Sequence, residues 1–368
     1  MSATTATPRG YNPYIHGLRG AGALMVLVYH AYLGAAQTGA LVVAPGSFAD
    51  HVFGSLRIGL EMFFMISGYL ITETLIRKAS VPGFLIDRLL RVYPAYIGVL
   101  IPLCVFGIWR HVEMFAETPA WSWPLHILAN LLFLPGVFQL PIVLNVSWSL
   151  SFEMAFYLAA AWAFVLYHRG RPAAAAAFAL AVGFLLFSRS ATAMFFFAGI
   201  GICLWREQLI SPWMRRVPPA LSFVALVVVW QTLVLDYSRA QAHLNAWYAA
   251  LLVLSFFLGL ILFDAVVAGR GLLIAALRWR PIQFTATVSY SFYLWHAVLM
   301  WPLKRSLVPK LLPVLGPELT FVVFTLASLL LSWAVAWVSY ELLESRLRQY
   351  LARRWSPRKP ADAPVVVS

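Results

Sequence analysis

The chain carries a long succession of apolar stretches, most of them close to the length of a membrane-spanning helix. Such a helix needs about 20 mainly apolar residues. The stretches that qualify are 15–35, 57–77, 92–109, 147–168, 173–188, 190–206, 218–236, 246–268, 284–304 and 317–340. Only 11% of the 368 residues are charged, against about 25% in soluble domains. The sequence therefore predicts an all-α, polytopic membrane helical bundle with about ten transmembrane helices.

Basic residues predict which loops face the cytoplasm. Cytoplasmic loops of membrane proteins are enriched in Lys and Arg, and here basic residues gather at 77–91, 168–171, 206–216, 270–280 and 346–359. If all five regions are cytoplasmic, both termini are cytoplasmic too. Three basic residues then fall outside, against the trend: Lys304, Arg305 and Lys310.

The segment 121–141 is apolar but contains Pro124, Pro135 and Pro141. With the basic loops on one side, the chain must enter and leave this segment on the same side. We therefore interpret it as a re-entrant or interfacial segment on the outer side. Irregular backbone at membrane depth must be covered by protein or line a wet cavity.

The formal net charge of +13 would suit a nucleic-acid-binding protein, but the same charge follows from basic loops flanking membrane helices. We expect no nucleic-acid partner. Arg greatly outnumbers Lys, and two explanations stay open: recognition of phosphate groups by guanidinium forks, or the codon bias of a GC-rich genome.

The domain organisation expected from these patterns is simple. Residues 1–14 form a polar N-terminal segment without a cleavage pattern, 15–348 form one membrane domain, and 349–368 form a basic tail predicted to be disordered. The two cysteines, Cys104 and Cys203, lie in apolar runs and are expected to be core thiols.

Ionisable side chains inside spans are candidates for function, because burying them in lipid is costly. Arg19 and His30 lie eleven residues apart on the first predicted helix, which places them on one face about 16 Å apart. A role for Arg19 as a cytoplasmic anchor and for His30 as a core histidine remains the alternative.

Glu61 lies near the outer end of the second predicted span, at a depth similar to that of His30. We predict that the two side chains pair, with the carboxylate orienting the imidazole as in catalytic triads. The alternative is that Glu61 extends to water. Gly68, seven residues further on, is expected to allow close helix packing.

Two later spans carry polar stripes. Ser149, Glu153 and Tyr157 recur at intervals of four residues and share a helix face. Tyr293 and His296 form a second stripe with Ser289. Both stripes suit a supporting or acceptor-binding role, although interhelical hydrogen bonds or an interfacial histidine would give the same patterns.

Further arginines complete the candidate set. Arg88 and Arg91 project together at the cytoplasmic start of the third span, and with Arg19 they would form a basic mouth for phosphate groups. Arg189, at an outer turn, either pairs with an acid or binds substrate. We expect no metal ion: His30, Glu61 and His296 could be drawn as a metal site, but their spacing does not constrain one, and no HExxH motif is present.

Six sequence blocks resemble those of the acyltransferase-3 family of membrane acyltransferases, in the same order, from about 14 to 348. They are GLRG-x9-H at 17–30, GLEMFFMISGYLIT at 59–72, DRLLRVYPAY at 87–96, VSWSLSFEMAFYL at 146–158, SYSFYLWH at 289–296 and SYELLESRLR at 339–348. One departure is Glu61, where the family often has Asp; the longer side chain weakens the predicted contact with His30.

The resemblance implies an enzyme of the bacterial cytoplasmic (inner) membrane that moves an acyl group, usually acetyl, from acyl-CoA to a carbohydrate hydroxyl. It implies that His30 is catalytic with Glu61 in support, that Arg19, Arg88 and Arg91 handle the donor, and that Glu153 is a supporting acid. Direct transfer and an acyl-histidine intermediate both remain open, as does the acyl group. A transporter or flippase of a lipid-linked glycan is the alternative function, and a non-catalytic scaffold is a weaker one.

Overall fold

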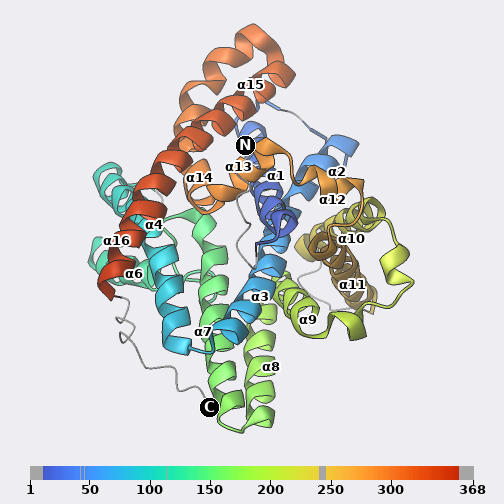
Figure 1. Cartoon of the computed structure of the whole chain (residues 1–368). Coiled ribbons are helices and arrows are strands. Elements are labelled where there is room, and N and C mark those ends of the chain that lie inside the picture. The colour runs from blue at the N-terminus through green and yellow to red at the C-terminus, as the bar shows by residue number, and fades with distance from the viewer. Residues whose placement is uncertain (1–10, 42, 45, 113, 240–245, 356–368) are drawn as a thin grey trace, which may run out of the picture.

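The computed structural model describes residues 11–41, 43–44, 46–112, 114–239 and 246–355, and every secondary-structure element within these ranges is helical (Figure 1). The prediction of an all-α fold is therefore confirmed. The long helices are α1 (Pro13–Gln37), α3 (Gly59–Lys78), α4 (Val81–Arg110), α7 (Trp148–His168), α8 (Pro172–Arg189), α9 (Met194–Leu209), α10 (Pro219–Arg239), α11 (Ala246–Ala268), α14 (Ser289–Ser306) and α15 (Val308–Ser339). The shorter ones are α2 (Phe48–Ser55), α5 (Met114–Glu117), α6 (Trp123–Leu131), α12 (Leu272–Ala276), α13 (Arg280–Thr287) and α16 (Arg348–Trp355).

Single turns of 3-10 helix lie between several of these helices, and one π-helical stretch joins α15 to α16. The 3-10 turns are η1 (Leu56–Ile58), η2 (Ala120–Ser122), η3 (Asn145–Ser147), η4 (Ala191–Ala193) and η5 (Met214–Arg216), and the π-helix is η6 (Tyr340–Leu347).

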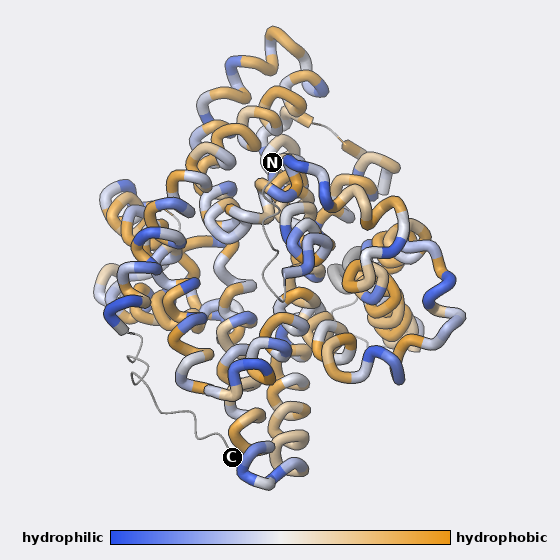
Figure 2. Tube along the Cα trace, in the orientation of Figure 1, coloured by the Kyte–Doolittle hydropathy of each residue, from blue (hydrophilic) through white to orange (hydrophobic). Residues whose placement is uncertain are grey.

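Several of these helices have the length and composition of membrane spans, and Figure 2 shows that many of their residues are hydrophobic. Among the described residues six continuous helical stretches are long and apolar enough to cross a membrane: 48–78, 81–110, 145–168, 172–189, 246–268 and 308–354. The chain is thus a multi-pass membrane protein. The total of about ten spans stays a prediction, as do the sidedness of the loops and the cytoplasmic location of the termini.

Several helix boundaries differ from the predictions. Helix α4 begins at Val81, eleven residues before the predicted span, because Ser80 caps its N-terminus and accepts a hydrogen bond from the Gly83 N–H. Helix α15 begins at Val308, with a break at Gly316 just before the predicted start at 317. Helix α16 continues to Trp355, so the first part of the predicted disordered tail is helical, while 356–368 and most of the N-terminal segment lie outside the described residues.

The predicted re-entrant segment 121–141 contains one α-helix, α6, of nine residues, which follows the 3-10 turn η2. At 1.5 Å per residue it is about 14 Å long, roughly half the thickness of the hydrocarbon core. Asn130 organises the irregular chain that follows: its side chain donates to the carbonyls of His126 and Pro141 and accepts from the Val143 N–H. The side of the membrane on which this segment lies stays a prediction.

Helices α1 and α3 form the centre of the bundle, with α4, α7 and α14 on one side and α9, α10 and α11 on the other (Figure 1). Glycines allow the closest approaches. A Cβ atom at Gly68 of α3 would collide with the Phe196 carbonyl of α9, and one at Gly199 with the Met65 carbonyl. The predicted close packing at Gly68 is therefore confirmed. This packing holds α3 between α9 and the polar interior described below.

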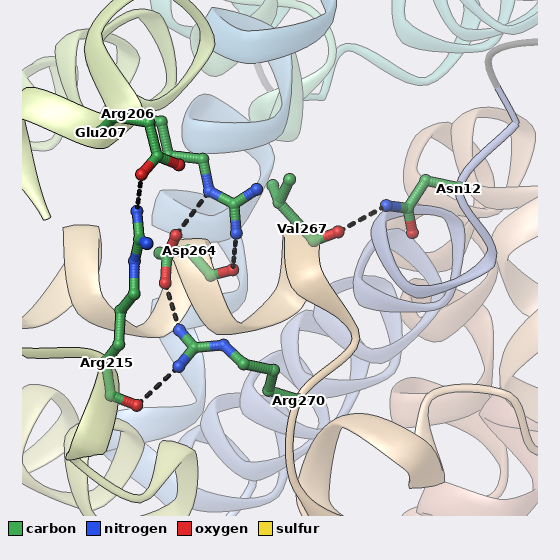
Figure 3. Close-up of polar contacts among 7 residues, drawn as sticks. All are labelled: Asn12, Arg206, Glu207, Arg215, Asp264, Val267 and Arg270. Atoms are coloured by element: carbon green, nitrogen blue, oxygen red, sulfur yellow. Dashed lines mark hydrogen bonds and ion pairs between the residues drawn. The ribbon is translucent and has the colours of Figure 1, made fainter. Parts of the chain in front are cut away.

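A buried carboxylate ties the ends of α9 and α11 together (Figure 3). Asp264 is 1% exposed and accepts from Arg206 Nε at 2.6 Å and from Arg270 Nη2. Arg270 also donates to the Arg215 carbonyl at 2.6 Å, and Arg215 pairs with the exposed Glu207. Because both guanidinium groups donate to Asp264 and Arg270 also donates to a backbone carbonyl, this cluster holds the end of α11 against α9.

Replacing Asp264 with Asn should therefore destabilise the fold. Removing one partner of a buried ion pair typically costs about 3–5 kcal/mol, and we expect somewhat less here because both arginines are about one-third exposed. The thermal unfolding midpoint of purified protein in detergent should fall by several degrees. Glu207→Gln, which removes only a surface pair, serves as the control, and equal midpoints for the two variants would contradict the assignment.

Candidate active site

A polar cavity lies where α1, α3, α4, α7 and α14 meet, and we call it the central cavity. Its volume is about 70 Å³. Its polar lining consists of Arg19 from α1, Ser67 from α3, Arg88 and Arg91 from α4, Ser149, Glu153 and Tyr157 from α7, and Ser289, Tyr290 and Tyr293 from α14. Most of the residues singled out in the sequence therefore converge, and the predicted stripe on α7 faces the cavity throughout.

Two of the three arginines keep their donors free. Among the described residues, neither Arg19 nor Arg91 has a hydrogen bond or ion pair to a side chain or carbonyl. Arg88 donates to Thr74 Oγ1 at 3.2 Å and lies over the rings of Phe84 and Tyr157. Arg19, Arg88 and Arg91 thus line one cavity, and their predicted role in holding phosphate groups stays a prediction. Guanidinium groups with unused donors in a cavity are suited to an anionic ligand.

Glu153 is the acidic side chain of the cavity lining, and its oxygen is already engaged. Its Oε1 atom accepts from Ser67 Oγ at 2.7 Å and from the Tyr157 hydroxyl. The bond from Ser67 joins α3 to α7, and the bond from Tyr157, within α7, further fixes the carboxylate that lines the same cavity as the arginines. With three arginines against one glutamate, the lining keeps an excess of positive charge.

A second, more open cavity adjoins the first at the N-terminal end of α1, and we call it the side cavity. Its volume is about 220 Å³, and it is lined by Tyr11, Asn12, Ile15, His16, Arg19, Tyr69, Leu70 and Glu73. Arg19 and Leu70 line both cavities. Arg19 therefore lies at the boundary between a peripheral opening and the polar interior.

Tyr293 lies between the central cavity and the two histidines. Its hydroxyl donates to the Val146 carbonyl at 3.0 Å and lies 2.8 Å from Ser149 Oγ, at the cavity wall. Its ring centroid is 5.7 Å from that of His296, one turn further along α14.

His30 and His296 form a pair that the sequence did not indicate. His30 Nδ1 lies 3.2 Å from His296 Nε2 and 2.9 Å from the Val26 carbonyl, while His296 Nδ1 lies 2.7 Å from the Tyr293 carbonyl. His296 is 1% exposed and His30 is half-buried. His30 itself does not line the central cavity. The interfacial alternative for His296 is therefore wrong, since the residue is in the protein interior.

The predicted pairing of Glu61 with His30 is also wrong. Glu61 is fully buried, and its Oε1 atom accepts from Trp230 Nε1 of α10 at 2.8 Å. Sequence position set its depth on α3 but not its direction: the side chain points to α10, whereas His30 points to α14. Its second oxygen has no hydrogen-bond partner among the described residues. A catalytic role for Glu61 thus loses its geometric basis.

Arg189 is not brought to the site. It is exposed at the end of α8, a helix that packs chiefly on α7. The turn after it, at Ser190, is where the sequence predicted it. A role of Arg189 in acceptor binding has no support from its position.

Several polar residues at or beside the cavity were missed. Ser67 and Tyr290 line it, and Tyr290 donates to the Val92 carbonyl at 3.0 Å. Glu344 of η6 accepts from the backbone N–H and the hydroxyl of Ser291, at 3.0 and 2.6 Å. Ser67 and Tyr290 each lie within a sequence block that resembles the family. Their presence in these blocks could have indicated that they belong to the site.

These helices and side chains define an integral-membrane helical bundle with a cationic cavity at its centre and a histidine pair beside it. A family model described as an acyltransferase domain matches residues 12–337. The chain belongs to the acyltransferase-3 family, as its sequence blocks predicted.

Named relatives are similar to parts of this chain. The peptidoglycan O-acetyltransferase OatA of Listeria monocytogenes is 22% identical across 95% of this chain and 58% of its own length. Nodulation protein 10 of Rhizobium leguminosarum bv. viciae is 28% identical over 33% of this chain and 37% of its own, and the exopolysaccharide production protein ExoZ of Rhizobium meliloti is 30% identical over 29% and 34%. This chain thus spans little more than half the length of OatA. No solved structure matches it.

Proposed function

We propose that this protein is a membrane acyltransferase that moves an acyl group, most simply acetyl, from acyl-CoA to a hydroxyl of a cell-surface or exported carbohydrate. The observation that carries the proposal is the central cavity, which contains arginines with unused donors and whose wall residue Tyr293 contacts His296 of the histidine pair. A scaffold has no need of such a costly arrangement inside a membrane protein.

The donor side of the proposal rests on charge. Acyl-CoA carries several phosphate charges at one end and a thioester at the end of a long, flexible arm. The side cavity offers a way in at the N-terminal end of α1, which we expect from the basic loops to face the cytoplasm of a bacterial cell. Arg19 lies where the side cavity meets the central cavity. Arg19, Arg88 and Arg91 would hold the phosphates through charge-assisted hydrogen bonds, while the arm extends past Tyr293 toward His30.

The chemical step assigned to His30 is general base catalysis. Its ring nitrogen takes the proton of the acceptor hydroxyl as the oxygen attacks the thioester carbon. The new C–O bond forms, the C–S bond breaks, and the leaving CoA sulfur takes the proton from the imidazolium. Base catalysis of this kind contributes about 10²–10⁴-fold, and positioning of the two substrates adds to it.

The acceptor side rests on the relatives. OatA is named for peptidoglycan O-acetylation, and ExoZ for exopolysaccharide production. A carbohydrate acceptor is the class common to these names, and the hydroxyl chemistry at His30 suits it.

The proposal is tested with membrane vesicles that contain the protein and with acetyl-CoA labelled in the acetyl group. We expect the label to appear, as an alkali-labile ester, in carbohydrate from vesicles with the protein and not in vesicles without it. Movement of unlabelled glycan across the membrane with no labelled ester would instead establish the transporter alternative and overturn the proposal.

A further inference from the structure

The hydrogen bonds of His296 determine where its proton lies. Its Nδ1 atom is 2.7 Å from the Tyr293 carbonyl. A carbonyl oxygen only accepts hydrogen bonds, so Nδ1 must carry the proton. In the neutral ring, Nε2 then holds the lone pair, and this is the atom that faces His30.

The same reasoning fixes His30. Its Nδ1 atom faces two acceptors at once, the Val26 carbonyl at 2.9 Å and His296 Nε2 at 3.2 Å. A lone pair on Nδ1 would be repelled by both, whereas a proton there can be shared between them. The neutral His30 ring therefore carries its proton on Nδ1 and its lone pair on Nε2, and Nε2 has no hydrogen bond to any described residue.

We infer that His296 is the positioning residue for His30, the role that the sequence analysis predicted for Glu61. We also infer that His30 Nε2 is the atom that takes the proton of the acceptor hydroxyl. This inference rests on the proposed function for its catalytic part. When Nε2 takes that proton, the ring becomes an imidazolium whose Nδ1–H still points at the lone pair of His296. A neutral acceptor thus does the work that an aspartate does in a serine-protease triad.

Burial favours a neutral partner at this place. His296 is 1% exposed and lies in a helix of the bundle. A carboxylate there would have to be desolvated without a fixed counter-charge, which is costly. An imidazole held by its own helix backbone supplies an acceptor at lower cost and prevents the ring of His30 from turning over.

The first test reads the tautomers directly and requires no acyl transfer. Protein labelled with ¹⁵N in histidine is measured by solid-state NMR in lipid at pH 8, with His30 assigned by its absence in His30→Gln. We expect a neutral His30 ring protonated on Nδ1, with a dipolar contact to an unprotonated His296 Nε2. A His30 ring protonated on Nε2 would overturn the inference whether or not the protein is an acyltransferase.

The second test uses a pair of variants in the labelled-acetyl assay. His296→Leu removes the acceptor and should lower kcat by about 10- to 100-fold, the worth of a hydrogen bond to a charged group, with KM for acetyl-CoA nearly unchanged. His296→Gln restores an acceptor oxygen at the same reach and should recover most of kcat. Equal losses in both variants, or a loss expressed only in KM, would show that His296 merely fills space.

Discussion

Replacing His30 with Ala is expected to lower kcat for acyl transfer by about 10²–10⁴-fold, the usual contribution of a general base. KM for acyl-CoA should change little, because the unused guanidinium donors of Arg19 and Arg91 lie in the central cavity and His30 does not line it. The measurement is initial-rate kinetics with labelled acetyl-CoA, at protein levels matched by quantitative blotting.

His51→Ala is the matched control for this variant. His51 also lies on a helix and contacts a carbonyl four residues earlier, Ser47, through its Nδ1 atom at 2.8 Å, but it is exposed on α2. It should retain wild-type turnover. If His30→Ala retained turnover within about twofold of the wild type, His30 would not be the general base.

The second large effect concerns the donor. Arg91→Gln keeps a polar side chain but removes a charge whose donors are otherwise unused in the cavity. Losing one charge-assisted hydrogen bond to a phosphate costs about 1.5–3 kcal/mol, which corresponds to a rise of roughly 10- to 100-fold in KM for acyl-CoA. The effect on kcat at saturating donor should be much smaller.

Arg110→Gln makes the same chemical change at the C-terminal end of α4, where the guanidinium is exposed and lies over the ring of Trp109. Its KM for acyl-CoA should equal that of the wild type. If Arg91→Gln and Arg110→Gln gave the same KM, the cavity arginines would not be donor ligands.

Most of the helices could be predicted because hydropathy alone decides which stretches enter lipid. The predicted helix boundaries were wrong where hydrogen-bonded caps and backbone breaks, rather than hydropathy, set the end of a helix. Val81 and Val308 begin helices that extend beyond the apolar stretches, the first fastened by a cap at Ser80 and the second continuing past a break at Gly316. Neither the cap nor the break can be detected from the mean hydropathy of the segment.

Helical periodicity predicted which site residues share a face of the same helix. Ser149, Glu153 and Tyr157 share a face by their spacing, and that face lines the cavity. Contacts between helices were not predictable in the same way. His30 and His296 are 266 residues apart, and Glu61 turned out to face Trp230, because the rotation of one helix against another depends on packing that spacing does not encode.

The account depends most on the central cavity being the donor site, and a photoreactive CoA analogue tests this most directly. The purified protein is labelled in lipid with and without excess acetyl-CoA, and the modified peptides are identified by mass spectrometry. We predict that labelling which acetyl-CoA prevents falls on peptides of α1, α3 and α4 that contain Arg19, Ser67 or Arg91. Protected labelling confined to other regions, such as the Asp264 cluster, would contradict the account.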